Sequence, residues 1–599
     1  QTVQGVLRIE GSDGSWDEGD SYFSVRNQPF HFFVNDTDTN LVNDVYCTAP
    51  GNNANSGLTN SAPMADLNAL LAKYDLEGGD IVFVDSGDYR TVAPWRITQA
   101  DSAGTLATNP VVIQGSTNAF PSGTVLYRSR NPVGIQVDYA VGLQLRNITV
   151  SNTLGTAVSI NNSLGVEAEW LAVGQATTAF QLYGGSRLRV AHCAVYDTEN
   201  GIDVGRFDRT LSGMVYPVLE HNVLWNLAGY GVQVGGDHRA TVRNSILSVR
   251  PGHYVYEMAT TATLEADYNA IWLGDGGRVF RRILPRYESP VPVIYETVGS
   301  WAAASGQDVH SHDSEPQMAA PSALDFHLRT QAPEGRWDPA LQIWTNDITT
   351  SPLVDAGWPG SEAWTNEPSP NGARVNIGLF GGSAEASASP TNSALHLLTL
   401  NRGGVASGQV ALNWVASGQA TGHTVRLSVS ADNGSHWTVV ASNLPASLGG
   451  VMWNSPSLSP NTSPLALWRA ESEQEAVSAT SELNFVLHNS PIAYYVNDDI
   501  SDSTDVYCTA AGNSTNTGIS RHSPKRWISE ILDTYNLEPG DTIYVDTGIY
   551  APSEPTVIGD LDAGDAVQDP GRQVTVQGST NTWQGGSLFF LSDDSVNAF

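Results

Sequence analysis

Apolar residues along the chain follow a short helical pattern and a long series of alternating patterns. The i, i+3, i+4 and i+7 spacing of one buried helical face begins just after Pro63 and comprises Leu67, Leu70, Leu71 and Tyr74. A strand rich in β-branched and aromatic residues, GGDIVFVDSGDY at residues 78–89, follows this helix. The order helix, glycine turn, strand is therefore predicted for the first ninety residues.

The same order recurs near the other end of the chain. FFVNDTDTNLVNDVYCTAPGN begins at Phe32 and YYVNDDISDSTDVYCTAAGN begins 462 residues later at Tyr494. The helical spacing returns after Pro524, and PGDTIYVDTGIY at residues 539–550 repeats the strand. A copied unit of about 462 residues is thus indicated.

A weaker period of 22 to 30 residues lies between the two copies. Each repeat has one polar or aromatic position between two apolar stretches: Asn147, Trp170, His192, Asn222, Asn244 and Asn269. Ten residues after each stands a position that we expect to point inward: Ala157, Phe180, Ile202, Val232, Tyr254 and Val279. A fixed offset inside such a period predicts a solenoid of stacked coils, with asparagines at one turn satisfying buried backbone groups.

A different pattern follows this region. Short alternating strands at Val410 to Trp414 and at Val425 to Val429, then a turn at Asp432 to Gly434, predict a β-sandwich. The strings LRIE at residues 7–10 and WRAE at residues 468–471 match, so the chain's first residues read as the last strands of another sandwich.

The predicted organisation is all-β and has five parts in tandem. They are the last strands of an incomplete sandwich (1–30), a coil stack with an N-terminal capping helix (31–384), a linker (385–393), a complete sandwich (394–490) and the start of a second stack (491–599). We expect either a segment of a longer tandem array or a chain whose unfinished end completes the start of the next.

The copied strings resemble a known family. The pattern G-D-x-(I/V)-x-V-x-x-G-x-Y after an amphipathic helix is similar to the N-terminal end of the right-handed parallel β-helix in the pectate-lyase-like superfamily. DFHL, SPLVDAGWP and NGARVNIGLFGG, within residues 325–382, resemble closing coils of repeat proteins in large secreted bacterial polypeptides. The sandwich resembles fibronectin type III or immunoglobulin-like modules. These resemblances imply the fold and leave the chemistry open.

Composition narrows the possible partners. The 62 acidic against 29 basic residues give a net charge of −33, which repels nucleic acid and favours divalent cations or cationic partners. No run of 18 apolar residues predicts a membrane span. Abundant small polar residues and only two lysines favour an extracellular location. Cys47, Cys193 and Cys508 form no disulfide framework, since Cys47 and Cys508 occupy one copied position.

Enzymatic chemistry is not favoured. Lyases of the superfamily that the chain resembles use a Lys or Arg base with carboxylate-bound calcium, and no lysine stands between Asp75 and Pro524. The Gly-His-Gly and Arg-Ile-Lys strings of hydrolases resembling polygalacturonase do not occur. A carbohydrate-active enzyme stays as the alternative.

Two weak candidate sites follow. The longest interval of the period offers a loop site for a glycan, for which the alternative is solvated turn residues: Asp203, Arg206, Asp208, Asp237 and His238. Alternating oxygen-bearing side chains near the start suggest a calcium loop, for which the alternative is an Asx-rich turn: Asp36, Asp38, Asn40 and Asp44.

The function expected from these patterns is structural. We expect a repeat unit of a giant extracellular structural or adhesive protein that forms a rod, sheath or surface filament. Its partners would be neighbouring copies of itself, with polysaccharide as a further candidate partner, and calcium is the one cofactor suggested. The alternatives are a polysaccharide lyase or glycoside hydrolase with an accessory sandwich, and a passive adhesin that binds glycans.

Overall fold

Strands dominate the part of the chain that the computed structural model describes, which confirms the predicted all-β class. The description leaves out residues 1, 19–22, 26–27, 107–108, 119, 122, 206–214, 274–276, 284–292, 296, 536, 553–555, 557, 559–572, 582–585 and 590–599. Two compact units divide the chain: Gln1–Pro285 with His310–Thr391, and Arg286–Val309 with Asn392–Phe599.

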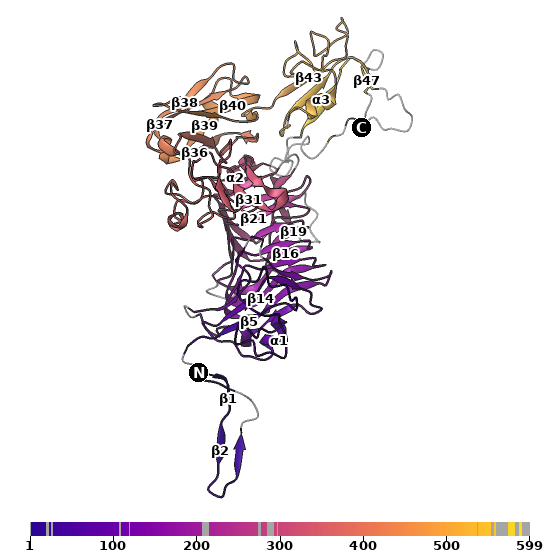
Figure 1. The fold of residues 1–599 in the computed structure, drawn as a ribbon. Helices are drawn as coiled ribbons and strands as arrows, with labels where there is room; N and C mark the ends of the chain where they lie inside the picture. Colours follow the sequence, from indigo (N-terminus) through magenta and orange to yellow (C-terminus); the bar gives the residue numbers. More distant parts are fainter. Residues whose placement is uncertain are drawn as a thin grey trace. The chain divides into compact units, whose positions relative to one another are not determined.

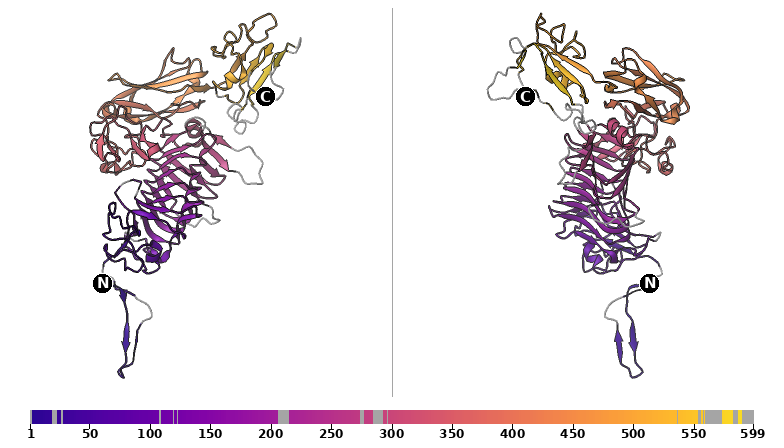
Figure 2. Two further views of the ribbon diagram at one scale, coloured as in Figure 1. Left: turned by 45° about the vertical axis from the view of Figure 1, so that its right-hand side comes forward. Right: turned by 180° about the vertical axis from the view of Figure 1, so that it is seen from behind.

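Most of the first unit is a stack of parallel strands, the parallel stack (residues 31–283; Figures 1 and 2). In its central part, three consecutive strands form one layer, and each of them pairs in parallel with the strand three places later in the chain. The central layers are β17 (Arg189–Ala191), β18 (Ala194–Tyr196) and β19 (Asn200–Val204); β20 (Val218–Glu220), β21 (Val223–Leu227) and β22 (Val232–Val234); β23 (Arg239–Arg243), β24 (Ile246–Val249) and β25 (Tyr254–Ala259).

Further strands extend both ends of the parallel stack. Toward its start lie β5 (His31–Val34), β6 (Ile81–Val84), β7 (Gly87–Tyr89), β8 (Trp95–Ile97), β9 (Val111–Gln114), β10 (Thr124–Tyr127), β11 (Val133–Asp138), β12 (Val141–Arg146), β13 (Thr149–Ser151), β14 (Thr156–Glu169), β15 (Ala172–Gly174) and β16 (Thr178–Ser186). Toward its end lie β26 (Thr263–Asp267), β27 (Ala270–Trp272) and β28 (Arg278–Ile283). Like residues of successive layers stack inside: Phe180 lies opposite Ile202, which lies opposite Val232, and all three are buried.

The register differs from the predicted one at several positions. Val158, Tyr256 and Phe280 occupy the row that stacks on Phe180 and Val232. The predicted Ala157, Tyr254 and Val279 are buried as expected but lie one or two residues away from this row. The left-handed turn residue that recurs between two rows of strands is Asn147, Trp170, His192, His221, Asn244 and Tyr268, each with φ between 52° and 57°. The predicted Asn222 and Asn269 therefore stand one residue past this turn.

Asn222 and Asn269 nevertheless do what the pattern suggested for asparagine. The Asn222 side chain accepts a hydrogen bond from the backbone N–H of Cys193 at 3.0 Å and donates one to Val190 O at 2.9 Å. Asn269 accepts from Ser245 N and donates to Val242 O in the same way. These buried amides satisfy backbone groups of the preceding layer.

The predicted helix is short. α1 (Leu67–Leu71) begins four residues after Pro63, with Asp66 as its N-cap and with Leu67 and Leu70 buried.

Antiparallel strand pairs lie on both sides of the parallel stack in the sequence. Residues 310–391 follow the stack and contain two such pairs, β30 (Met318–Ala320) with β31 (Asp325–Leu328) and β32 (Arg336–Asp338) with β33 (Ile343–Thr345). Ahead of the stack, β1 (Thr2–Gly5) pairs with β4 (Phe23–Val25), and β2 (Arg8–Glu10) pairs with β3 (Trp16–Glu18).

In the second unit, two sheets enclose one core and form the two-sheet domain (residues 394–488). One sheet contains β34 (Ala394–Leu397), β36 (Gln409–Ser417) and β39 (Gly450–Asn454); the other contains β35 (Val405–Ala406), β37 (Thr424–Ser430), β38 (Thr438–Pro445), β40 (Thr462–Ser472), β41 (Ser478–Thr480) and β42 (Phe485–His488). Trp414 and Trp468 are fully buried between them.

The second unit also holds α2 (Val298–Ser305) and the second copy of the parallel strands. This copy contains β43 (Ala493–Val496), α3 (Ile528–Leu532), β44 (Thr542–Val545), β45 (Gly548–Tyr550), β46 (Thr575–Gly578) and β47 (Ser587–Phe589). β43 pairs in parallel with β44, as β5 does with β6.

Candidate functional site

The suggested calcium loop lies between β5 and α1, and its oxygens accept hydrogen bonds from nearby backbone. The Asp36 carboxylate accepts from Asp38 N at 2.9 Å and from Asp88 N at 3.2 Å. Asp38 accepts from Asn40 N at 3.0 Å, and Asp44 accepts from the Asn35 side chain at 2.8 Å. Such contacts are those of an Asx-rich turn.

The second copy repeats this scheme. Asp498 accepts from Ile500 N at 2.9 Å and from Ile549 N at 3.1 Å, while Asp505 accepts from the Asn497 side chain at 3.2 Å. The described residues contain no group of three or more His, Cys, Asp or Glu side chains that could hold a metal ion. The calcium site therefore stays a prediction, and the contacts in both copies give the loop a structural role.

A fully buried carboxylate fastens the same loop, and the sequence reading missed it. Asp85 at the end of β6 accepts from Val45 N at 2.7 Å, from Tyr46 N at 2.8 Å and from Cys47 N. In the second copy Asp546 binds the three matching amides, of Val506, Tyr507 and Cys508. The copied string VD(S/T)G was the available signal, because a polar residue inside an apolar strand needs partners when it is buried.

All three cysteines are free and buried. Burial and the nearby Asp85 raise the pKa of the Cys47 thiol well above its usual range, and burial with Asp546 does the same to Cys508. Burial also raises the pKa of Cys193 to about 12. Thiols of this kind are unreactive, so these cysteines are structural.

The candidate loop site is only partly within the described residues. Arg206 and Asp208 lie outside them, and Asp237 is exposed in a turn. Asp203 on β19 is 8% exposed, and its carboxylate accepts a hydrogen bond from the Tyr183 hydroxyl at 2.6 Å. His238 is also buried, beside Gly205, where an added Cβ would lie 2.2 Å from the imidazole ring.

Asp203 belongs to a row of polar residues that runs across successive layers. Its partners in register are Gln181 on β16 and Gln233 on β22, and Gln233 is followed by Glu257 on β25. Gln233 donates to Glu257 at 3.1 Å, and Arg281 forms an ion pair with Glu257. These contacts tie the layers together through neighbouring side chains.

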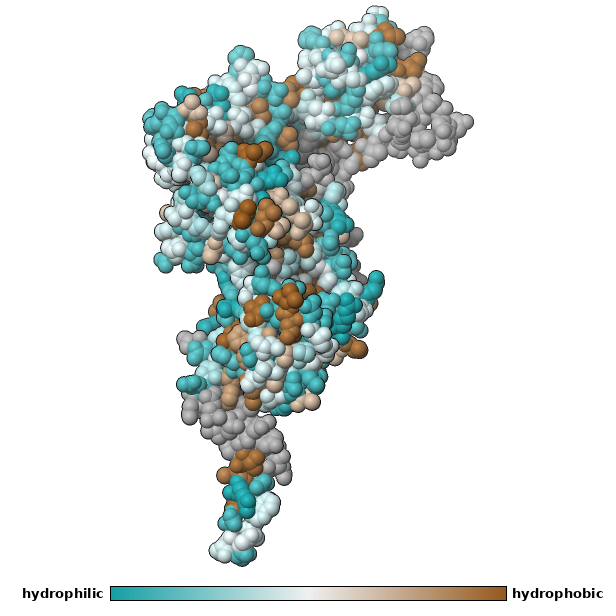
Figure 3. Space-filling model, viewed as in Figure 1, coloured by the Kyte–Doolittle hydropathy of each residue, from teal (hydrophilic) through white to brown (hydrophobic). Residues whose placement is uncertain are grey.

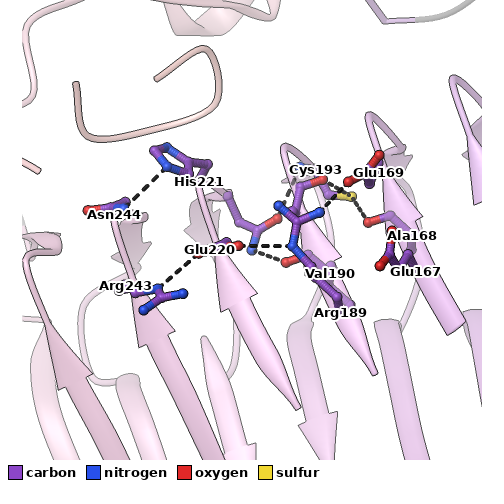
Figure 4. A network of polar contacts seen from close by, with 12 residues as sticks. Glu167, Ala168, Glu169, Arg189, Val190, Cys193, Glu220, His221, Arg243 and Asn244 are labelled. Atoms are coloured by element: carbon purple, nitrogen blue, oxygen red, sulfur yellow. Dashed lines mark hydrogen bonds and ion pairs between the residues drawn. The ribbon is translucent and has the colours of Figure 1, made fainter. Parts of the chain in front are cut away.

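A second row, which the sequence reading missed, is an alternating charge ladder (Figure 4). Arg189 on β17 lies between Glu169 of the preceding layer and Glu220 of the next, and Arg243 on β23 contacts Glu220 from the other side. Arg146 contacts Glu169 at 3.0 Å at the ladder's start. Burial alone would raise the pKa of Glu220, but Arg189 and Arg243 lower it to about 2.

The turn next to this ladder carries stacked rings. The His192 ring lies 4.6 Å from the Trp170 ring and 5.0 Å from the His221 ring, with interplanar angles of 11° and 5°. Burial lowers the pKa of His192, and burial together with His192 lowers that of His221 to about 3, so both are neutral at physiological pH. A neutral imidazole can stack without the cost of a buried charge.

The closing segment (residues 351–389) covers these rings. His192 Nδ1 lies 2.8 Å from Leu379 O, and Asn244 accepts a hydrogen bond from Trp358 N at 2.7 Å. Gly378 has φ of 104°, and an added Cβ would lie 2.7 Å from the Ile246 side chain, so glycine is needed there. The turn residues of the parallel stack therefore serve as docking points for the closing segment.

Two buried acids lie within the closing segment. Glu367 accepts from Asn376 N at 2.8 Å and from Gly382 N at 2.6 Å, and burial raises its pKa to about 8. Asp355 accepts from the Ser389 hydroxyl at 2.7 Å, and burial raises its pKa to about 6. Each acid has one buried oxygen that has no hydrogen-bond partner among the described residues.

A comparison with models of known protein families found no match, and neither did a comparison with functionally described proteins. No described helix has the length and apolar character that crossing a membrane requires. The carboxylates of Asp36, Asp85, Glu220 and Glu367 and the imidazole of His192 are engaged in turns, the ladder and docking contacts.

Proposed function

We propose that the chain is a repeat unit of an extracellular structural or adhesive protein that builds a rod, sheath or surface filament. In this proposal the parallel stack is a right-handed parallel β-helix of the pectate-lyase-like type, closed at its start by α1. The two-sheet domain is a fibronectin type III or immunoglobulin-like module that connects one β-helix to the next.

One observation carries the proposal: the connection between the two-sheet domain and the stack that follows it is packed, and one of its hydrogen bonds recurs in the first copy. In the second unit, Asp541 accepts from Ile492 N at 2.7 Å and lies 2.9 Å from His488 Nε2 of β42. At the matching place in the first copy, Asp80 accepts from Phe30 N at 2.8 Å. A rod built from repeat units is stiff only if consecutive units are joined in a fixed way. An enzyme, by contrast, can carry an accessory module on a flexible connection.

The core of the second stack continues into the two-sheet domain. Val486 of β42 is buried in the same cluster as Ile492 and Ile543, and Val405 and Leu465 pack against it. Burial of these side chains removes apolar surface from water and limits bending at the connection. We therefore infer a stiff link between the two-sheet domain and the stack that follows it.

Charge supports the same role. A net charge of −33 on each such chain keeps rods apart at low ionic strength, and divalent cations can bridge them. The lateral spacing of the rods would then depend on salt concentration, because the electrostatic repulsion between them is screened over a Debye length of about 8 Å at physiological ionic strength.

Negative-stain electron microscopy of native material tests the proposal. We expect units joined end to end at a regular repeat, on the surface of the cell or in shed filaments. Single dispersed particles, together with release of reducing ends or unsaturated uronate from pectin or alginate, would favour the carbohydrate-active alternative instead.

A further inference from the structure

The first strands of the chain form a small antiparallel element, the N-terminal hairpin (residues 2–25), that repeats part of the two-sheet domain. In the hairpin, β1 pairs with β4 so that Thr2 lies opposite Val25 and Gly5 opposite Phe23. The same pairing recurs between β40 and β42 of the two-sheet domain, where Ser463 lies opposite Leu487 and Ala466 opposite Phe485. The second pairing is copied too, because Glu10 lies opposite Trp16 and Glu471 opposite Ser478. The hairpin therefore has the register of β40, β41 and β42.

Side chains on one face of the two elements also match. Arg8 lies 3.9 Å from Glu10 in β2, and Arg469 lies 3.3 Å from Glu471 in β40. Since neighbouring residues of a strand alternate between faces, Leu7 and Ile9 correspond to Trp468 and Ala470 on the opposite face.

That opposite face is buried in one element and exposed in the other. Trp468 and Ala470 are fully buried, whereas Leu7 is 62% and Ile9 is 68% exposed. Hydrophobic surface is accordingly visible on the N-terminal hairpin at the lower end of Figure 3. Apolar residues at adjacent inward positions of a strand are typical of a face that packs against another sheet.

The two-sheet domain shows what covers this face and what lies along its edge. The sheet of β34, β36 and β39 packs across the core against Trp468 and Ala470. Along the edge, β37 pairs with β40 so that Leu427 lies opposite Ala470 and Val429 opposite Trp468. Among the described residues, β2 pairs only with β3, so the edge that corresponds to the β37 side of β40 has no strand beside it. An open strand edge with exposed apolar side chains is a template for an added strand.

We propose that the N-terminal hairpin is a docking surface for the front strands of a two-sheet domain. Its occupant is a polypeptide with the chemistry of residues 392–461, the front segment, which holds β34 to β39. The strand equivalent to β37 adds antiparallel to β2, and the strands equivalent to β34, β36 and β39 cover Leu7 and Ile9. This inference goes beyond the proposed function, because it names a contact surface and requires neither a cellular location nor a filament.

Hydrogen exchange of the full chain tests the inference. The front segment is supplied as an extra copy joined before Gln1, so that its last residue is followed directly by Gln1. We expect exchange in residues 7–18 to slow at least a hundredfold in this joined form. The exchange rates of β40 and β41, measured in the same molecule, give the protection expected for these strands in a complete two-sheet domain.

Matched variants separate docking from general stabilisation. Ile9→Asp in the hairpin, or Leu427→Asp in the added front segment only, should abolish the slowing and leave β40 unchanged. Unchanged exchange in residues 7–18 of the joined form, with normal protection of β40, would overturn the inference. That result would leave the electron-microscopy test of the proposed function unaffected, so the two can fail separately.

Discussion

The Nε atom of Arg189 lies 2.9 Å from a carboxylate oxygen of Glu220 in the next layer of the parallel stack. The Glu220 side chain is 15% exposed and receives a second guanidinium from Arg243. Removal of one partner from such a site leaves poorly solvated charges without compensation, which costs about 3 kcal/mol.

Glu220→Gln should therefore weaken the middle of the parallel stack. We expect amide exchange in β20 and β23 to accelerate roughly a hundredfold, given about 1.4 kcal/mol for each factor of ten. Asp88→Asn is the matched control, because the pair of Asp88 with Arg90 is more than half exposed on both sides and is expected to contribute less than about 1 kcal/mol. Equal effects of the two substitutions would contradict the role assigned to the ladder.

The closing segment should lose stability as pH rises. The folded pKa of Glu367, about 8, lies above its ordinary value of 4.5, so the folded form prefers the protonated acid. Its stabilising effect is complete below about pH 4.5 and declines by about 1.4 kcal/mol for each pH unit up to about 8. Protection factors of residues 351–389, corrected for intrinsic exchange, should fall over this range.

Glu367→Gln should remove the decline between about pH 6 and 8, while the part below about pH 6 that comes from Asp355 should remain. A glutamine oxygen can still accept from Asn376 N and Gly382 N, and the side chain has no charge at any pH. Glu362→Gln, at an exposed position of the same segment, is the control. If wild type and Glu367→Gln lost protection equally between pH 5 and 8, another group would govern the segment.

The two copies of the buried carboxylate provide an internal control for each other. Asp85→Ala removes the acceptor of three amides and should expose the neighbouring Cys47, whereas Asp546→Ala should expose Cys508. We expect the labelling rate of the affected thiol with a thiol reagent, followed by peptide mass spectrometry, to rise at least tenfold. The thiol of the intact copy should stay slow; equal acceleration of both would indicate global unfolding.

His488→Ala should loosen the link between the two-sheet domain and the second stack. Loss of a hydrogen bond to a charged group costs about 1.5–3 kcal/mol, so exchange of the Tyr494 and Val496 amides should accelerate tenfold or more. His488→Gln retains a donor and should restore part of the protection. No change in either variant would show that apolar packing around Val486 alone holds the link.

Chelation tests the calcium loop. The Asp36 and Asp38 carboxylates accept backbone hydrogen bonds of their own loop or the adjacent strand, so EDTA should leave the thermal unfolding midpoint within about 1 °C. A larger decrease that calcium reverses would instead support a metal site at Asp36, Asp38, Asn40 and Asp44.

The sequence predicted the strand content and the copied unit, because apolar alternation and repetition need no knowledge of contacts. It predicted the turn at Asn147, Trp170 and His192 correctly but misplaced it at Asn222 and Asn269. Asparagine suits both the left-handed turn and the buried position next to it, so residue type alone does not fix the register.

The ion pairs and buried acids could not be predicted for a related reason. Arg189 and Glu220 are 31 residues apart and meet only when the layers are aligned. Glu367 stands in the polar string SEAWTNEPSP, which reads as an exposed loop, and its burial depends on Asn376 and Gly382 folding over it.

The left-handed backbone at His192 and His221 has an evolutionary consequence. Since each layer contains the same turn and touches mainly its immediate neighbours, gain or loss of two adjacent layers keeps the other layers in register and keeps Arg and Glu alternating along the charge ladder. A gene for such a protein can therefore lengthen or shorten by pairs of layers while every version still encodes a folded stack.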